Sequence, residues 1–451
     1  MRKFKKGLVL SLVTAMAISA LAGCGSSGST AKKLGVSDGG KVLNIYCWNE
    51  EFKSRVKDHY PDYVEVDATH GKIGDVDVVW TIVANDNNAY QNNLDATLEK
   101  QASAAADAKI DIFLVEADYA LKYVDTTYTA PVADLGITKD ELSKQYTYTQ
   151  DIVTDSTGAL KGVSWQGCPG VLVYNREVAK EVFGTDEPAK VQEYVKDWDT
   201  FLATADTLAS KGYNITSTVN DTYRVFSNNV TKKWVDDKKN LVIDDNIMKW
   251  VEMSKKMVDA KQTTTAELWS DDWNQGFYSE GKVFCYFGPA WLIDFCMKAD
   301  DPKSVAGKGQ WAATEGPQGF YWGGTWICAA DGTDNSSLVA DIIRKLTVDD
   351  AIMQDIVEKD NDFVNNKTVM DAMANDKTYG DAVLGNQNAL AMFCAGAEKI
   401  DLSNLSSYDQ GCNEEFQAAM KDYFDGNCDL DTALATFKKN IKAKYPAINV
   451  Q

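Results

Sequence analysis

The chain has 451 residues, 45% hydrophobic and 25% charged, with a formal net charge of −20. This is the composition of an ordinary globular protein, and so acidic a surface argues against nucleic acid or anionic lipid headgroups as partners. Only two histidines are present, His59 and His70, so a histidine-based nucleophile triad or a multi-histidine metal site has little material. We expect no cofactor and no metal site.

The N-terminus carries the features of an export signal. Four basic side chains between Arg2 and Lys6 precede an uncharged, mostly apolar stretch over 7–22. That stretch is shorter than the ~20 residues of a membrane-spanning helix, as in secretory signals. It ends in Leu21-Ala22-Gly23-Cys24, which resembles the lipobox of bacterial lipoproteins. The alternative is an ordinary signal with a chance cysteine.

The lipobox resemblance implies a signal peptide over 1–23 and lipidation of Cys24. The following Gly/Ser-rich stretch predicts a flexible tether over 24–40. We therefore expect the protein on the extracellular face of the cell membrane, in a Gram-positive bacterium, with the lipid anchor as its only contact with the membrane. The rest of the chain is longer than one hydrophobic core usually spans, which predicts two lobes.

Strands that alternate with helices begin at Val42. Apolar runs at 42–48, 76–83 and 110–115 are typical of strands covered on both faces, and helices are expected at 50–59 and 88–106. A second unit starts near Leu160, with strands at 162–165 and 171–174 and helices at 178–183 and 191–210. A Gly-rich segment at 316–325 precedes a strand at 326–330, and the chain beyond is mostly helical. This order predicts an α/β protein.

The nine cysteines show no Cys-x-x-Cys spacing, and most lie in apolar runs. We expect mostly free, buried thiols. One or two bridges among the eight that follow Cys24 stay open.

Several segments in chain order resemble the extracellular solute-binding proteins of carbohydrate ABC transporters, the group that includes maltose-binding protein. They lie at 43–50, 111–118, 172–176, 277–291 and 322–324. Trp291 stands three residues after Gly288, where the family has two. The resemblance implies a periplasmic-binding-protein-like fold of two α/β lobes, with a hinge and a ligand cleft between them. Lobe one would take residues 40–152 plus 309–350, and lobe two residues 153–308 plus 351–451.

The resemblance also implies a non-catalytic monomer that captures a mono- or oligosaccharide and delivers it to the transmembrane subunits of an ABC permease. Two alternatives stay open. One is a lipid-anchored glycoside hydrolase with paired carboxylates. The other is the same fold binding a polyamine, which Arg224 in the cleft would oppose.

A sugar cleft needs aromatic faces beside carboxylates, amides and guanidinium groups, and open α/β sheets bind ligands at the carboxyl ends of their strands. Residues of these types at predicted strand ends and in polar loops are the candidate ligand-binding residues: Trp48, Asn49, Glu50, Glu116, Asp118, Trp165, Gln166, Asp221, Tyr223, Arg224, Trp291, Trp322, Gly324 and Asn388. Trp269 and Trp273 are instead read as either cleft residues or one buried helix stripe. No catalytic residue is expected.

Overall fold

The computed structural model describes residues 33–450. The predicted signal peptide and Cys24 therefore lie outside the described residues. Within them, no helix is long and apolar enough to cross a membrane.

The first lobe is built on a seven-stranded sheet with the order β2-β3-β4-β1-β5-β12-β6. Its centre is parallel, since β1 pairs with both β4 and β5, whereas β12 runs antiparallel to β5 and β6. The strands are β1 Val42–Cys47, β2 Tyr63–Glu65, β3 His70–Ile73, β4 Val76–Ile82, β5 Ile112–Glu116, β6 Val163–Ser164 and β12 Thr325–Ala329.

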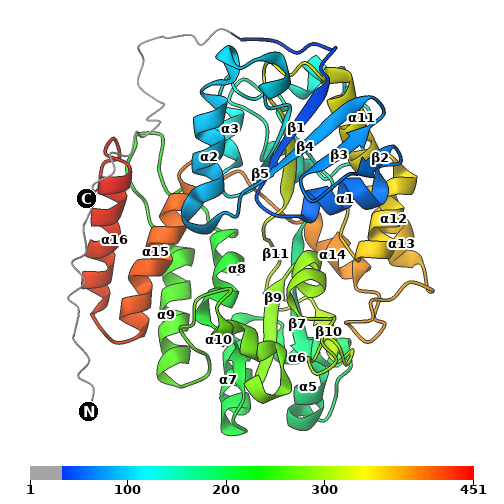
Figure 1. Cartoon of the computed structure of the whole chain (residues 1–451). Coiled ribbons are helices and arrows are strands. Elements are labelled where there is room, and N and C mark those ends of the chain that lie inside the picture. Colours follow the sequence, from blue (N-terminus) through cyan, green and yellow to red (C-terminus); the bar gives the residue numbers. More distant parts are fainter. Residues whose placement is uncertain (1–32, 451) are drawn as a thin grey trace, which may run out of the picture. The chain divides into compact units, whose positions relative to one another are not determined.

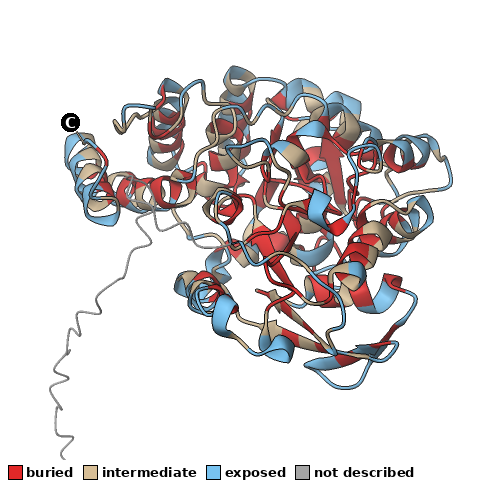
Figure 2. Ribbon diagram, turned by 90° about the horizontal axis from the view of Figure 1, so that it is seen from above, coloured by how far each residue is buried: buried red, intermediate tan, exposed pale blue. Residues whose placement is uncertain are grey.

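Apolar side chains on both faces of this sheet hold helices in place. Leu43 and Ile45 of β1 pack with α1 (Glu51–His59) and α11 (Ser336–Thr347), whereas Phe113 of β5 packs with α2 (Ala89–Leu98) and α3 (Ala120–Val124). Figure 1 shows these two helix pairs beside the sheet, and Figure 2 shows buried residues concentrated in the strands. A short helix, α4 (Thr147–Asp151), precedes β6.

The helix predicted at 88–106 is shorter in the structure, because α2 ends at Leu98. Two 3₁₀ turns follow, at Gln101–Ser103 and Ala106–Ala108. The Gln101 amide holds them by bonding both the N–H and the carbonyl of Ile110, which fixes the entry to β5.

The second lobe is built on a five-stranded sheet with the order β10-β7-β9-β8, and β11 pairs separately with β7. Its central strand, β7, is buried along its whole length. The strands are β7 Pro169–Asn175, β8 Asn214–Thr216, β9 Val283–Gly288, β10 Trp311–Thr314 and β11 Phe320–Tyr321. Because β10 and β11 belong to this sheet, the prediction that the return to lobe one begins at residue 309 is wrong for residues 309–321.

Some of the remaining helices contact strands of the second sheet and the others pack on helices, among them Asp350–Asp360, which packs on α1 and α11 of the first lobe. Asn175 and Asp197 cap α5 and α7 through their side chains. The helices are α5 Arg176–Phe183, α6 Pro188–Val195, α7 Trp198–Ser210, α8 Tyr223–Ser227, α9 Asp245–Asp259, α10 Asp271–Asn274, α12 Asp350–Asp360, α13 Lys367–Asn375, α14 Leu390–Ala397, α15 Asp409–Phe424 and α16 Leu430–Lys444. All eight described cysteines are free thiols, and five of them are buried.

Three segments lie side by side: two connect strands of the two sheets, from β6 to β7 and from β11 to β12, and one joins α12 to α13. Residues 165–167 pair with 363–365, since Gly167 N donates to Phe363 O (2.9 Å) and Asn365 N donates to Trp165 O (2.7 Å). The third segment, 320–324, joins them where Trp322 N donates to Cys168 O (3.2 Å). We call 165–167, 320–324 and 361–366 the crossing segments.

Candidate functional site

Strand ends of the first lobe gather the candidate residues at one sheet edge. β1 ends at Cys47, just before Trp48, and β5 ends at Glu116. β12 runs the opposite way and starts at this same edge, because Thr325 lies opposite Glu116. Residues 48–50, 116–118 and 322–324 therefore follow or precede strands at the same edge of the sheet.

The second lobe presents the matching edge. β9 ends at Gly288, which lies opposite Val171 near the start of β7. β8 runs parallel to β9 and leads through the turn Val219–Thr222 into α8, which carries Arg224. The strand ends of β8 and β9 thus lie toward the crossing segments and the first lobe.

An ion pair joins the two edges. Arg224 Nη1 donates to Asp118 Oδ1 (2.6 Å), and its second terminal nitrogen pairs with the other carboxylate oxygen. Both side chains are only 19% exposed. Burial lowers the pKa of the Arg224 guanidinium, but the Asp118 carboxylate outweighs it and leaves that pKa above its usual range. This two-point, charge-assisted pairing joins the loop after β5 to α8 of the second lobe.

Glu116 lies beside this pair and has no cation of its own among the described residues. Its Oε2 accepts a hydrogen bond from Asp118 N (2.8 Å). Burial, followed by the negative charge of Asp118, raises the pKa of Glu116. A carboxyl group in this state can serve as donor or acceptor to a hydroxyl-bearing ligand.

Three tryptophans form an aromatic cluster at the edge of the second lobe. The ring centroids of Trp291 and Trp322 are 5.1 Å apart, and Trp269 lies 6.2 Å from the first and 5.6 Å from the second. Trp269 is 52% exposed, whereas Trp273 is buried, so these two do not form one buried stripe. Trp48 is half-buried in the first lobe, edge-on to Tyr90 and Tyr119.

Three predicted cleft residues lie in the interior instead. Trp165 is fully buried, stacks on Phe52 at 5.5 Å and is not an open platform. Asp221 accepts hydrogen bonds from Trp273 Nε1 (2.7 Å) and Thr218 N (2.9 Å), and burial raises its pKa to about 7. The buried hydroxyl of Tyr223 donates to the Asn413 side chain (2.6 Å).

The remaining candidates differ in their placement. Asn388 is committed to the backbone, since its amide donates to Met373 O (2.9 Å) and Asp376 O (3.1 Å). Asn49 accepts from Glu51 N (3.1 Å) at the start of α1, beside the exposed Glu50. Gly324 has a φ of 103°, and a Cβ there would lie 3.1 Å from the Trp326 ring.

A second polar centre joins the predicted residue Gln166 to three residues that the sequence did not single out, Glu51, Arg55 and Asp362. Gln166 Nε2 donates to Glu51 Oε1 (2.6 Å) and to Asp362 Oδ2 (3.0 Å), and Arg55 lies 3.5 Å from that same Asp362 oxygen. Burial, and after it the Asp362 carboxylate, raises the pKa of Glu51 to about 7. The four-residue spacing of Glu51 and Arg55 was the available signal, but their partner lies more than 300 residues further along the chain.

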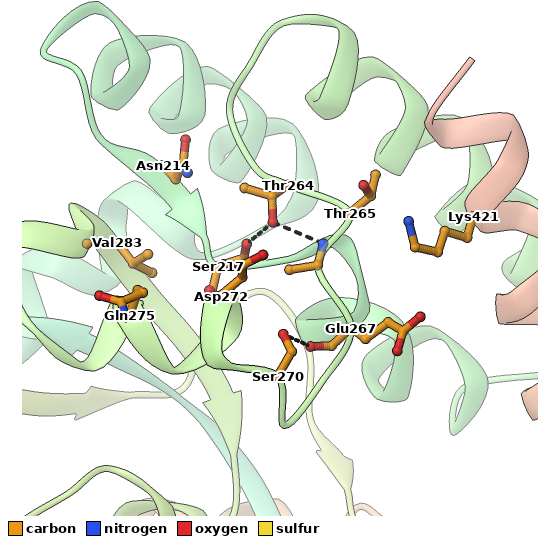
Figure 3. Close-up of a pocket in the computed structure, with 13 residues that line it drawn as sticks. Asn214, Ser217, Thr264, Thr265, Glu267, Ser270, Asp272, Gln275, Val283 and Lys421 are labelled. Atoms are coloured by element: carbon orange, nitrogen blue, oxygen red, sulfur yellow. Dashed lines mark hydrogen bonds between the residues drawn. The ribbon is translucent and has the colours of Figure 1, made fainter. Parts of the chain in front are cut away.

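Two cavities in the described residues differ in size and place. A volume of about 30 Å³ next to Asp118 and Arg224 has room for little more than one water. A larger one, of about 540 Å³, lies wholly in the second lobe along β8 (Figure 3), where hydroxyls such as those of Thr264 and Ser270 donate to backbone carbonyls. Across residues 33–450 no group of histidine, cysteine and acidic side chains is arranged to hold a metal ion.

Comparisons with known proteins fit this architecture. Residues 71–383 match the family model described as bacterial extracellular solute-binding protein. Among solved structures, an extracellular solute-binding protein family 1 is similar with a TM-score of 0.70 at 16% identity, covering 90% of this chain and 99% of that one. A search of curated proteins finds no match.

Two further similar structures hold sugars. The ABC transporter associated binding protein from B. animalis subsp. lactis Bl-04, in complex with beta-1,6-galactobiose, gives a TM-score of 0.67 at 18% identity, over 90% of this chain and 98% of that one. The galacto-N-biose-/lacto-N-biose I-binding protein from Bifidobacterium longum, in complex with lacto-N-biose, gives 0.67 at 13% identity, over 92% and 100%.

Proposed function

The chain belongs to the bacterial extracellular solute-binding proteins, and from this we propose that it captures a sugar or oligosaccharide between its two lobes for an ABC importer. The observation that carries the proposal is the meeting of strand ends from both lobes around the Asp118–Arg224 pair and the tryptophan cluster. Carboxylate and guanidinium groups match sugar hydroxyls, and tryptophan faces match the C–H surface of a sugar ring.

We propose as contact residues those near the facing strand ends, in α1 and in the tryptophan cluster whose side chains suit a sugar. They are Trp48, Glu50, Glu51, Glu116, Asp118, Arg224, Trp269, Trp291 and Trp322. Trp165, Asp221, Tyr223 and Asn388 are left out, because packing or internal hydrogen bonds already occupy their side chains.

A thermal-shift panel of neutral disaccharides, amino sugars and polyamines, with product analysis on the same samples, tests this function. Binding of one sugar without release of reducing ends supports a receptor, and its melting temperature should rise with the logarithm of ligand concentration. Hydrolysis that Glu116→Gln abolishes would make the protein a glycoside hydrolase. A rise with polyamines alone would change the solute class.

In this proposal Cys24 anchors the protein outside the cell, next to the permease it supplies. The Leu21-Ala22-Gly23-Cys24 sequence before a Gly/Ser-rich stretch supports it. Mass spectrometry of the native protein should find an acylated N-terminal Cys24, with more than one acyl chain for stable attachment. An unmodified Cys24, or cleavage at another site, contradicts the anchor and leaves the solute-binding function intact.

A further inference from the structure

One face of α1 carries three ionisable residues at intervals of four. Glu51, Arg55 and His59 therefore lie in a row along the helix. The row packs against the last turn of α12 and the crossing segment that follows it, where Asp360 and Asp362 stand.

His59 is held between two carboxylates. Its side chain is fully buried, with Nδ1 2.9 Å from Asp355 Oδ2 and Nε2 2.7 Å from Asp360 Oδ2. A neutral imidazole has one N–H and one lone pair, so one carboxylate would face a lone pair. Only the doubly protonated ring donates to both, and the geometry therefore favours the imidazolium.

The other charged groups around His59 are already paired. On α12, Lys359 bonds Asp355 (2.7 Å), and on α1 the Arg55 guanidinium lies 3.1 Å from Asp360. On α11, Asp341 accepts from the hydroxyl of Tyr60, the residue next to His59. Burial raises the pKa of Asp355, but the bonds from Lys359 and His59 outweigh it and leave that pKa below its usual value. Two carboxylates thus share the imidazolium.

From His59 the contacts run without a break to the cleft edge. Asp360 leads to Arg55, and Arg55 leads to Asp362 (3.5 Å). The same Asp362 oxygen accepts from Gln166, which also bonds Glu51 at the first turn of α1. The row on α1 therefore contacts two of the three crossing segments: Glu51 bonds Gln166 of 165–167, and Arg55 lies next to Asp362 of 361–366.

We propose that this face of α1 is a charged brace. His59, bonded to Asp355 and Asp360, holds α12 and, through Arg55, the crossing segments against the first lobe in the arrangement that binds solute. His59 acts as a positioning residue, since it touches no solute. The inference rests on the proposed function, because movement between the lobes must pass through the crossing segments.

The protonation state can be read directly. The chain has only two histidines, so nitrogen-detected NMR of the wild-type protein shows two rings, and His70→Gln assigns them. His70 is an exposed residue paired with Asp67, away from this face. We expect both ring nitrogens of His59 to carry protons at pH 7. A neutral His59 ring at pH 7 overturns the proposal, and this measurement needs no His59 variant.

Hydrogen exchange measures how firmly the two crossing segments are held together. The backbone amides of Gly167 and Asn365 donate hydrogen bonds from each of these segments to the other. Their protection, corrected for intrinsic rates, should fall about tenfold in His59→Gln but not in His70→Gln. Unchanged protection in His59→Gln overturns the proposal.

Measurements of solute binding distinguish a failure of the brace from a failure of the proposed sugar-receptor function. With β-1,6-galactobiose and lacto-N-biose as probes, His59→Gln should bind about tenfold more weakly than both the wild type and His70→Gln. Equal affinity overturns the brace and leaves the receptor. A panel in which no sugar binds, with the exchange result as expected, overturns the receptor and leaves the brace.

Discussion

The candidate site residues fall into two groups: side chains that are buried in the core, and side chains that stay partly exposed at the proposed cleft. Trp165 and Trp291 show the division, since both follow or precede short strands and both look like sugar platforms in sequence. Trp165 is covered on every side, and its indole N–H donates to Asp362 (3.3 Å). Trp291 is half-buried among other rings, with its N–H donating to Trp322 O (3.0 Å). Burial of this kind depends on which distant segment covers the ring, and the sequence does not contain that directly.

Replacing each tryptophan by alanine should separate the two roles. Trp165→Ala should lose roughly 3–5 kcal/mol of unfolding free energy, as for other buried large-to-small changes. Trp291→Ala should keep most of that stability and bind sugar about tenfold more weakly, the effect of ~1.4 kcal/mol. Urea unfolding and calorimetric titration of both variants measure this. Equal losses of stability would place Trp291 in the core as well.

Asp221 predicts a pH dependence of stability. Its folded-state pKa of about 7 lies well above the usual range of an aspartate, because burial disfavours the charge. The folded state therefore binds the proton more tightly, so this contribution to stability is present at low pH and is lost as the pH rises from about 4 to 7. Asp221→Asn cannot ionise, and the stability difference between wild type and variant should shift against the wild type over that range. A difference that stays constant from pH 4 to 8 would contradict the burial of an ionisable Asp221.

At the scale of elements, strand ends were easier to predict than their partners. The two strand ends that carry 48–50 and 116–118, at one edge of the first-lobe sheet, follow from apolar runs of strand length. The placement of β10 in the second sheet did not, because Trp311–Thr314 is apolar on both faces and would suit either sheet. The α1 row also escaped prediction, since helical spacing shows that Glu51 and Arg55 share a face but not what lies opposite.

The crossing segments are packed so closely at Gly167 that adding one methyl group there should separate them. A Cβ at Gly167 would lie 2.7 Å from the Phe363 ring and 3.1 Å from the hydroxyl of Tyr148. Gly167→Ala must therefore push the two segments apart, at a cost of about 1–3 kcal/mol. We expect a lower melting temperature and weaker sugar binding together. As a control, Gly319→Ala stands in a segment where a Cβ meets no atom within 4 Å, and it should change neither.

At the scale of the whole molecule, the division into two lobes could be predicted from the sequence, but the residues at which one lobe ends and the other begins could not. Chain length, alternating elements and the order of the motifs were enough for a two-lobe α/β protein. The lobe boundaries are set by long-range pairing, such as that of Gly167 with Phe363, which leaves no mark on either local sequence.

Ligand binding should draw the lobes together through the crossing segments. Small-angle scattering should then give a smaller radius of gyration with a bound sugar than without it. Asp118→Asn should reduce this change, because it removes the charge that Arg224 meets across the lobes. An identical radius at saturating sugar would mean that the lobes do not move.

The tryptophan cluster has a spectroscopic consequence. Indole emission moves to shorter wavelengths when a ring leaves water. Trp269 is half exposed, whereas Trp291 is half-buried and Trp322 is buried. Among the twelve tryptophans of the chain, the described ones other than Trp269 are less open to solvent. A solute that covers this ring should therefore shift the tryptophan fluorescence of the protein to shorter wavelengths. The variant Trp269→Phe should not show this shift. The protein would then carry its own optical reporter of occupancy, and its affinity for any candidate solute could be read without a label.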